Sequence, residues 1–325
     1  MKANLNLKTL VLLLTMGTCT VLINSSCKDN DDPLPAKKGA ITEIIAASPA
    51  FSVLKDAVLK AGLDGTLKGA GPFTVFAPDN AAFTASGITS LAGFSADSIK
   101  RILLYHTLAS KKLAADLPAG PNAKLTTATT DGDSIFVTKK SGTVFINGIL
   151  VTTADFPADN GVIHTINRVL IPASGNLVAT VIKATGGDNG LDSLLKAVVR
   201  ADAAAPGLIT LLNSNLLTVF APTNKAFRDL LTALGKPNID QIDIALLNKV
   251  LQYHVFAGRA FSSDLSAGQE LTMFGTTGKT VIALPTTGPT IKGASNTTAS
   301  KIIGANIVTR KGVVHLIDQV LRPLP

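Results

Sequence analysis

The 325-residue chain contains no tryptophan and only two tyrosines, Tyr105 and Tyr253. Proteins that hold single-stranded nucleic acids by stacking need exposed aromatic rings as platforms. Glutamate is equally scarce, because Glu43 and Glu270 are the only two and the remaining acidic residues are aspartates. The scarcity of aromatic residues therefore argues against an open stacking platform for bases or sugars.

The chain has only two cysteines, Cys19 and Cys27. Cys19 lies in an apolar N-terminal stretch that we expect to be removed, and we expect the thiol of Cys27 to carry lipid. The mature chain would then have no pair of thiols for a disulfide, so its stability has to come from core packing. An apolar fraction of 46% is sufficient for such a core and argues against disorder.

The N-terminal residues have the pattern of a bacterial lipoprotein signal. Two lysines precede the apolar stretch Leu10–Ile23, which is short for a membrane span and interrupted by threonines and a glycine. Two serines then lead into Cys27, before which we expect cleavage. We predict a signal peptide at 1–26 and a flexible tether at 27–39. The protein would be lipid-anchored to the outer membrane of a bacterial cell envelope and exposed at the surface.

The residues after the predicted lipidation site are acidic and polar. Asp29, Asp31 and Asp32 are similar to the surface-export signal of some bacterial lipoproteins. A simple hydrophilic tether would explain the same composition equally well.

The net charge of +8 does not by itself indicate a nucleic-acid partner. The basic residues are scattered along the chain, and no basic run is interleaved with aromatic residues. A solvated basic surface is the simpler interpretation, and a mild attraction to anionic polymers stays open. We predict no nucleic-acid binding.

The sequence also lacks short motifs that are typical of several enzyme classes. It has no GxSxG nucleophile motif, no phosphate-binding P-loop and no GxGxxG after a predicted strand. Aspartates are frequent, but no pair is distinguished as the two carboxylates of a glycosidase. DGDS at Asp131–Ser134 lacks the later ligands of a calcium-binding loop, so we expect a hairpin turn there.

What the chain does contain is a long internal repeat. TVFAPDNAAF at Thr74–Phe83 recurs as TVFAPTNKAF at Thr218–Phe227, with eight of the ten residues identical. Three further pairs of segments match in the same order, namely Phe51–Leu63 with Leu191–Asp202, Leu103–Ser110 with Leu251–Gly258, and Gly161–Pro172 with Gly312–Pro323. Each repeat has the size of a domain, which indicates a tandem duplication of one fold.

We place the first domain at 40–173 and the second at 177–325. Few residues separate the last matched segment of the first repeat from the first helical pattern of the second, near Leu177. So short a linker cannot act as a long tether. We therefore expect the two domains to contact each other as a rigid pair, with some hinge motion at Gly175 left open.

The repeated decamer is interpreted as a folding element. Thr74-Val75-Phe76 is a short β-prone run, and the proline that follows cannot donate to a strand ladder. Asp79 and Asn80, with Thr223 and Asn224 in the second copy, are preferred residues for capping a helix. The decamer thus predicts a strand, a stop, a helix cap and a core-facing phenylalanine.

The rest of each repeat changes from helical to strand patterns. Apolar spacing predicts helices within 41–61, at 96–104 and at 243–252. In the first repeat, four segments rich in Thr, Val, Ile and Phe predict antiparallel strands, at 124–130, 134–139, 143–151 and 162–170. Helices first and strands second indicate an α+β domain.

All four histidines and both tyrosines occupy matched positions in the two repeats. Four histidines could supply metal ligands or a general base, but no pair has the HExxH spacing, and no cysteine or glutamate accompanies them. Each lies in an apolar run, so we interpret them as hydrogen-bonded braces of the interior. The predicted structural core motif comprises Tyr105, His106, His164, Tyr253, His254 and His315. We predict no catalytic residue, no metal and no cofactor.

These residues give each repeat a strong resemblance to a fasciclin (FAS1) domain, covering almost all of 41–325. The two decamers match the first signature of that family, and the Tyr-His pairs at 105–106 and 253–254 match its central one. The segments 161–172 and 312–323 match its last signature. The resemblance implies an α+β fold with two tandem domains, each a twisted antiparallel β-wedge packed with several α-helices.

The chain departs from the family pattern in a few places. Asn167 replaces the usual aspartate of the last signature, whereas Asp318 keeps it, and Arg310-Lys311 replaces the usual Asn-Gly pair. In some animal members the residues just before this signature contact integrins. The corresponding stretches, Thr153–Asp159 and Ile303–Thr309, differ from each other and from those motifs, so we do not carry that activity over.

The resemblance implies a non-catalytic protein of cell adhesion or of the extracellular matrix. Two copies of one fold favour avidity for an extended partner, which we expect to be an extracellular protein or polysaccharide. The alternative is a lipoprotein that captures a glycan or small ligand for an outer-membrane partner. It predicts an apolar pocket between wedge and helices or at the domain junction. An unrecognised hydrolase would need polar side chains converging beside His106 or His254.

Overall fold

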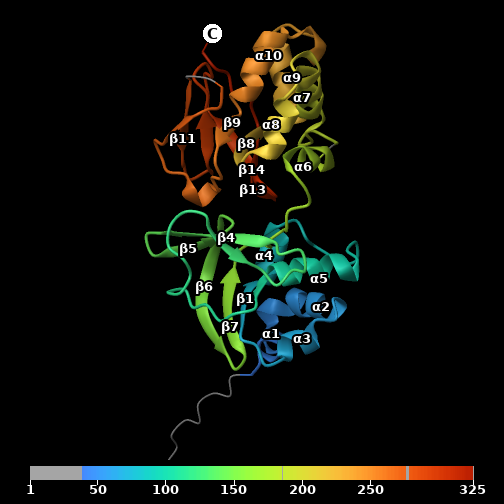
Figure 1. The fold of residues 1–325 in the computed structure, drawn as a ribbon, viewed down its shortest axis with the longest axis vertical. Helices are drawn as coiled ribbons and strands as arrows, with labels where there is room; N and C mark the ends of the chain where they lie inside the picture. Colours follow the sequence, from blue (N-terminus) through green and yellow to red (C-terminus); the bar gives the residue numbers. More distant parts are fainter. Residues whose placement is uncertain (1–38, 185, 276–277, 325) are drawn as a thin grey trace, which may run out of the picture. The chain divides into compact units, whose positions relative to one another are not determined.

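The computed structural model describes residues 39–184, 186–275 and 278–324. The predicted signal peptide, the tether up to residue 38 and Cys27 lie outside these ranges. Within them the chain forms two α+β domains of one design, drawn in blue to green and in yellow to red in Figure 1. In each domain the helices lie on one side of a curved sheet.

The first domain begins with helices that precede its first strand. They are α1 (Ile41–Ala47), the 3-10 turn η1 (Pro49–Phe51), α2 (Ser52–Lys60) and α3 (Asp64–Lys68). Strand β1 (Phe73–Pro78) then leads into α4 (Asn80–Ala85) and α5 (Ala96–Tyr105). The remaining strands are β2 (Thr107–Leu108), β3 (Ala123–Thr126), β4 (Ser134–Lys140), β5 (Thr143–Ile146), β6 (Ile149–Ala158) and β7 (Gly161–Ile166).

The second domain repeats this order with small changes. Its helical elements are α6 (Leu177–Lys183), α7 (Asp192–Ala204), α8 (Leu208–Ser214), α9 (Asn224–Ala233), η2 (Ile239–Gln241), α10 (Ile244–Gln252) and η3 (Ser262–Asp264). Its strands are β8 (Leu217–Pro222), β9 (Val255–Ala257), β10 (Glu270–Thr272), β11 (Lys279–Ala283), β12 (Thr290–Lys292), β13 (Ser300–Thr309) and β14 (Gly312–Ile317). The α+β expectation is thus confirmed for both domains.

Each sheet has seven strands and is mixed. The orders are β2-β1-β7-β6-β5-β4-β3 and β10-β11-β12-β13-β14-β8-β9. Neighbours are antiparallel except that β1 runs parallel to β7, with Thr74 opposite Val162, and β8 runs parallel to β14. A parallel pair needs a long connection rather than a hairpin, and here the helices and outer strands of the domain supply it. The antiparallel wedge that we expected therefore contains one parallel pair.

Two apolar cores stabilise each domain. In the first domain, one core packs α1, α2 and α5 against the β1–β7 pair, with Ile41, Leu54 and Ile163 almost completely buried. The other lies within the curl of the sheet and contains Phe76 and Ile135. The second domain has the same two clusters, one among its helices and one around Phe220 and Ile282. The strands join the two cores, because successive side chains point to opposite faces.

The decamer forms the turn between a strand and a helix in both domains. Asp79 is the N-cap of α4 and accepts a hydrogen bond from the Ala82 N–H at 2.7 Å, while Thr223 caps α9 in the same way. The residue after the cap, Asn80, bonds to a different helix. Asn80 Oδ1 accepts from the N–H of Val53 at the start of α2. The decamer therefore satisfies the N-termini of two helices at once.

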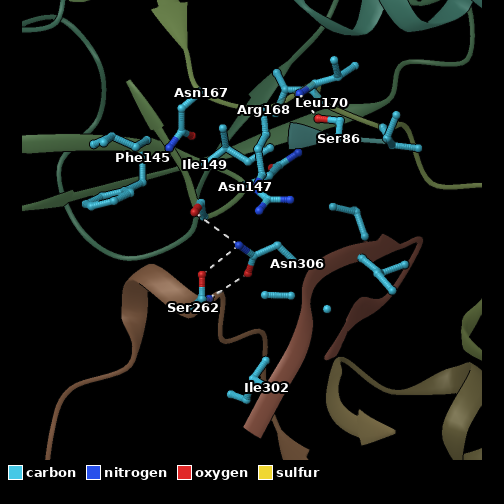
Figure 2. Close-up of a pocket in the computed structure, with 18 of the residues that line it drawn as sticks. Ser86, Phe145, Asn147, Ile149, Asn167, Arg168, Leu170, Ser262, Ile302 and Asn306 are labelled. Carbon is cyan, nitrogen blue, oxygen red and sulfur yellow. Dashed lines mark hydrogen bonds between the residues drawn. The ribbon is translucent and has the colours of Figure 1, made fainter. Parts of the chain in front are cut away.

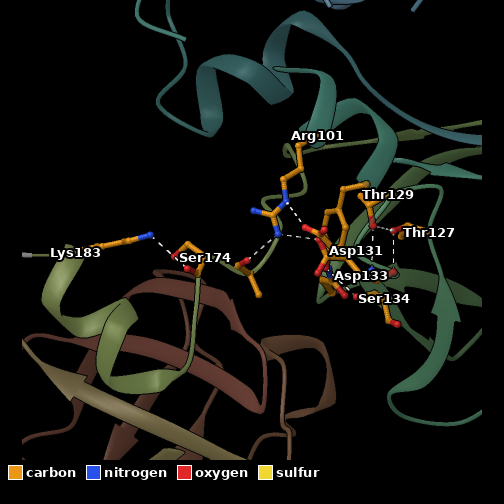
Figure 3. A network of polar contacts seen from close by, with 11 residues as sticks. Arg101, Thr127, Thr129, Asp131, Asp133, Ser134, Ser174 and Lys183 are labelled. Atoms are coloured by element: carbon orange, nitrogen blue, oxygen red, sulfur yellow. Dashed lines mark hydrogen bonds and ion pairs between the residues drawn. The ribbon is translucent and has the colours of Figure 1, made fainter. Parts of the chain in front are cut away.

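The short linker is hydrogen-bonded on several sides, as Figure 3 shows in part. Arg101 donates from Nη2 to the carbonyl of Ala173 at 3.2 Å, and Lys183 donates to the carbonyl of Ser174 at 3.3 Å. The carbonyl of Gly175 accepts from the Arg310 N–H at 3.0 Å. Three successive linker carbonyls thus have partners, which restrains the backbone around Gly175.

The domains also contact each other through side chains on β4 and the loops of the second domain. Lys140 Nζ donates to the carbonyl of Leu265 at 2.8 Å. Thr138 Oγ1 donates to Asp264 at 2.7 Å. The Arg259 guanidinium lies 3.7 Å from the centre of the Phe136 ring, a cation–π contact. The junction is therefore polar and specific rather than a broad apolar seam.

Candidate functional site

The Tyr-His pairs lie in the interior. In the first domain, His106 is buried at the end of α5, where its Nδ1 donates to the carbonyl of Ile102 at 2.7 Å and its Nε2 accepts from the N–H of Leu170 at 2.9 Å. Tyr105 donates its hydroxyl to the carbonyl of Ser134 at 2.9 Å and accepts from Asn147 Nδ2 at 3.0 Å. Tyr105 thus joins the end of α5 to β4, and His106 joins it to the segment that follows β7.

The second domain repeats these bonds. His254 donates to the carbonyl of Val250 at 2.7 Å and accepts from the N–H of Leu321 at 2.8 Å. Tyr253 donates to the carbonyl of Lys279 at 2.6 Å and accepts from the N–H of Ala294 at 3.0 Å. The histidine bonds are equivalent in the two domains, whereas the tyrosine hydroxyl accepts from a side-chain amide in the first domain and from a main-chain N–H in the second.

The other two histidines lie on the parallel strands. His164 stacks on Phe76 and His315 on Phe220, with ring centroids 5.4 Å apart in both pairs. His164 Nε2 donates to the carbonyl of Lys112 at 2.9 Å, and its Nδ1 accepts from the Asp155 N–H at 3.2 Å. His315 makes the corresponding bonds to Ala260 and Asn306.

The surroundings of the histidines favour neutral rings. Each ring accepts a main-chain N–H on one nitrogen, which assigns the proton to the other. Burial lowers the pKa of His106, His254 and His315 to about 4, although a hydrogen bond to a carbonyl opposes the shift in each. Burial also lowers the pKa of His164. With both nitrogens occupied, none of these rings has a lone pair or a proton for a substrate.

Metal ligands do not gather elsewhere in the described ranges, where no group of three or more His, Cys, Asp and Glu side chains could hold an ion. In the DGDS segment, Asp133 accepts from Arg101 Nη2 at 2.9 Å, and Asp131 lies 3.6 Å from Arg101 Nε (Figure 3). The Asp133 N–H donates to Thr129 Oγ1 at 3.0 Å. Arg101 therefore balances the carboxylates of a loop between β3 and β4.

Small apolar hollows lie beside the histidines of the Tyr-His pairs. The one next to His254 is lined by aliphatic side chains such as Leu177 and Leu212 and has a volume of about 30 Å³. The one next to His106 has about 20 Å³. Ligand pockets usually measure several hundred Å³, so these hollows are too small for a ligand.

A larger cavity, of about 630 Å³, lies at the domain junction (Figure 2). The first domain contributes the turn Asn147–Gly148, the start of β6 and the segment 167–172. The second contributes Ser262 and the strand β13. Asn306 Nδ2 donates to the carbonyl of Gly148 at 3.2 Å across one end of the cavity. Its size is within the range of small-molecule sites.

The exposed stretch of β6 is a second candidate surface. Residues 152–157 are all exposed, and Phe156 keeps 49% of its surface accessible. Only Ile149 and Leu150 pair with β5, so the outer half of β6 pairs with β7 alone. The equivalent strand β13 is less exposed. The stretch Thr153–Asp159 lies in β6 except for Asp159, which follows it, and Ile303–Thr309 lies in the less accessible β13.

The chain belongs to the fasciclin domain family. The model of the Fasciclin domain matches residues 49–172 and 193–323, which confirms the resemblance found in the sequence. The two matched segments correspond to the two domains in Figure 1.

Similar proteins come from bacteria and animals. Protein sll1483 of Synechocystis is 38% identical over 136 residues, covering 41% of this chain and 73% of that protein. Transforming growth factor-beta-induced protein ig-h3 of Sus scrofa is 30% identical over 239 residues, covering 72% of this chain and 32% of that protein. Human periostin is 27% identical over 264 residues, covering 79% of this chain. The chain therefore spans about a third of the length of ig-h3.

Among solved structures, a FAS1 domain pair from the insect cell adhesion molecule fasciclin I is similar. Its sequence is 18% identical, the match covers 84% of this chain and 96% of that one, and the TM-score is 0.40.

In the part of the chain that the structure describes, no helix is both long and apolar enough to cross a bilayer.

The junction cavity includes residues that the sequence analysis did not select. In the sequence, Asn167 is notable only as a departure from the family signature, and Arg168 has no distinguishing pattern. A signal was present in the different lengths of the two β-hairpins. Asn147-Gly148 is a two-residue turn signal, whereas the corresponding segment of the second repeat is longer.

Proposed function

We propose that this protein mediates adhesion at the cell surface, or binds a matrix polymer, through its two fasciclin domains and without catalysis. Family membership over most of the chain is the observation that carries the proposal. The hydrogen-bonding of the four histidines and two tyrosines supports it, because these side chains act within the fold. The partner would be an extracellular protein or polysaccharide.

The proposal includes a lipid anchor at Cys27 on the outer membrane. It is supported by the signal-like pattern of 1–26 and by the polar composition of 27–39. Replacing Cys27 with alanine should move the protein from the membrane fraction into the soluble fraction of broken cells. Mass spectrometry of the native N-terminal peptide should show an acylated cysteine, and an unmodified thiol would contradict the anchor.

The exposed half of β6 is where we propose to test adhesion. The purified pair should be retained on at least one member of a panel of fibrous extracellular proteins and acidic or neutral polysaccharides. Phe156→Ala should lower retention several-fold, because exposed aromatic side chains are frequent anchors of interfaces. Leu59→Ala is the matched control, because Leu59 lies on α2 and is 55% exposed. Equal retention of both variants would remove β6 as the binding surface.

Small-ligand capture is a second candidate, and the junction cavity is the observation that favours it. Pockets of this size at the contact between two domains are frequent ligand sites. Capture and adhesion use different surfaces, so each can be tested without the other.

A further inference from the structure

The two domains differ in what covers the segment that follows their last strand, β7 in the first domain and β14 in the second. In the second domain, the loop 293–299 between β12 and β13 covers the segment that follows β14. Asn296 accepts from the Arg322 N–H at 2.7 Å and donates to the Val320 carbonyl at 3.0 Å. Gln319 donates to the carbonyl of Ala299 at 3.3 Å. Residues of the second domain itself thus satisfy the hydrogen-bonding groups of this segment.

Asp318 of the second domain is also satisfied locally. Its Oδ1 accepts from the Lys301 N–H at 2.7 Å and from Ser300 Oγ at 3.0 Å. Asp318 and Gln319 correspond in the repeat to Asn167 and Arg168 of the first domain. In the second copy, both side chains therefore contribute to the fold.

The first domain lacks the covering loop. Its β5 and β6 are joined by Asn147–Gly148 alone. Asn167 and Arg168 are exposed, and the Asn167 side chain has no hydrogen bond within the described residues. Arg168 makes one, from Nη1 to the carbonyl of Ala85 at 2.9 Å, and no carboxylate of the described chain pairs with it. Several guanidinium donors stay unused at the wall of the cavity (Figure 2).

The cavity walls show which ligand chemistry fits. Among the described residues that line it, Arg168 is the only charged one, and it gives the site a positive charge. Aliphatic side chains line it from both domains, and Ile171 and Ile303 keep 52% and 47% of their surfaces exposed. Phe145 is the only aromatic side chain in the described part of the lining, which provides little flat surface for a sugar ring. One guanidinium suits a singly charged carboxylate, whose two oxygens match its fork.

We propose that the junction cavity binds a small aliphatic monocarboxylate. Its carboxylate would accept from Arg168 and from the amide of Asn167, and its hydrocarbon chain would lie against Ile149, Ile171 and Ile303. The proposal rests on the second candidate function, ligand capture, and is independent of adhesion. Burying the exposed isoleucine surface on the hydrocarbon chain supplies an apolar contribution to binding.

Octanoate is the test ligand and octanamide its neutral match. Calorimetry should give measurable binding of octanoate and weaker binding of octanamide. Arg168→Gln should weaken octanoate binding about 10- to 100-fold, because hydrogen bonds to charged groups contribute about 1.5–3 kcal/mol. The variant introduces the residue that the second domain carries at this position, Gln319, so the fold should tolerate it. Lys55→Gln, on α2, removes the same charge outside the cavity and should bind like the unmodified protein.

Methyl NMR of isoleucine-labelled protein locates the site independently of affinity. Octanoate should shift the Ile149, Ile171 and Ile303 methyl signals and leave Ile41, in the helical core, unchanged. If the junction signals shift but Arg168→Gln binds equally well, the carboxylate assignment is overturned and capture stands. If neither octanoate nor octanamide shifts them, both the assignment and ligand capture at the junction are overturned.

Discussion

Leu170 donates its main-chain N–H to Nε2 of His106, 64 positions earlier in the chain, at 2.9 Å. The bond joins the segment after the last strand of the first domain to the end of α5. Because a protonated ring could not accept this N–H, the contact exists only while His106 is neutral. Leu321 and His254 form the same contact in the second domain.

Stability should therefore fall in mildly acidic solution. The unfolded chain protonates its histidines near pH 6.5, whereas burial lowers the pKa of His106, His254 and His315 to about 4. Between these values the unfolded state binds more protons, so the free energy of unfolding rises with pH, by about 1.4 kcal/mol per pH unit for each histidine.

Urea unfolding from pH 4.5 to 8 checks this. The free energy of unfolding should be nearly constant above pH 7 and should decrease steadily below about pH 6.5. His106→Gln removes one titrating ring and should flatten the slope by the equivalent of one proton. A free energy that does not change between pH 6.5 and 4.5 would contradict neutral, buried histidines.

Both tyrosines should ionise at unusually high pH in the folded protein. Burial raises the pKa of Tyr105 to about 12 and also raises the pKa of Tyr253. Absorbance near 295 nm should follow both titrations cleanly, since the chain has two tyrosines and no tryptophan. Tyr253→Phe leaves only the Tyr105 signal, which should have its midpoint near pH 12. A midpoint near 10 in the folded variant would show that Tyr105 is accessible to water.

The asparagine that follows each helix cap should contribute measurably to stability. Asn224 is almost buried, accepts from the Ser193 N–H at 2.8 Å, and donates to the Gly187 carbonyl and to Asp192. Asn224→Ala should lower the free energy of unfolding by about 1–3 kcal/mol, because buried polar groups lose their partners.

Asn215→Ala is the control for this substitution. Asn215 is exposed, directly follows α8, and within the described residues donates only to the Leu211 carbonyl of that helix. Its replacement should change stability by less than about 0.5 kcal/mol in urea unfolding at pH 7. If Asn224→Ala and Asn215→Ala lower the free energy of unfolding equally, the hydrogen bonds between the α9 cap and α7 have no special role.

Arg259 should hold the two domains in a fixed arrangement. Its guanidinium lies over the Phe136 ring, and its carbonyl accepts from Asn122 Nδ2 at 2.7 Å. Arg259→Ala should weaken the junction by about 0.5–2 kcal/mol, since this cation–π contact is partly desolvated. NMR relaxation should then report faster, more independent tumbling of the two domains.

The matched variant for this measurement is Arg228→Ala. Arg228 pairs with Asp188 on the exposed side of the second domain. The substitution removes one positive charge without touching the junction, so tumbling should match that of the unmodified protein. Identical relaxation in both variants would show that Arg259 does not restrain the domains.

Much of the fold could be predicted because its signals are local. The decamers indicated a strand, a stop and a cap, and Asp79 and Thr223 do cap helices. The helix expected at 96–104 is α5, and the one at 243–252 is α10. These elements depend on residues close in sequence, so composition and spacing were sufficient.

Other features could not be predicted from local patterns. The parallel pairing of β1 with β7 joins segments more than eighty residues apart, and side-chain alternation does not encode strand direction. The strand expected at 143–151 is divided by the Asn147–Gly148 turn. Residues 153–158 belong to β6 although proline and aspartate disfavour strands. Asp155 lies at a register shift, and Pro157 lies where β6 pairs with β7 alone, so one edge of the strand is open.

The junction cavity was beyond sequence reasoning for a different reason. Its walls come from segments in separate domains, among them the two-residue turn Asn147–Gly148 of the first and β13 of the second. Neither copy contains the site alone. Only the three-dimensional structure distinguishes Asn167 and Arg168 from their hydrogen-bonded counterparts Asp318 and Gln319.

Several junction contacts have a main-chain carbonyl as the acceptor, including the bonds from Lys140 to Leu265 and from Asn306 to Gly148. Every amino acid carries that oxygen. The acceptor oxygen therefore survives a substitution at position 265, although burial of the Leu265 side chain in the core restricts which residues fit there, whereas a change at Lys140 would remove the bond. After the duplication, each half of the gene would be constrained at its own donor position, Lys140 in the first half and Asn306 in the second.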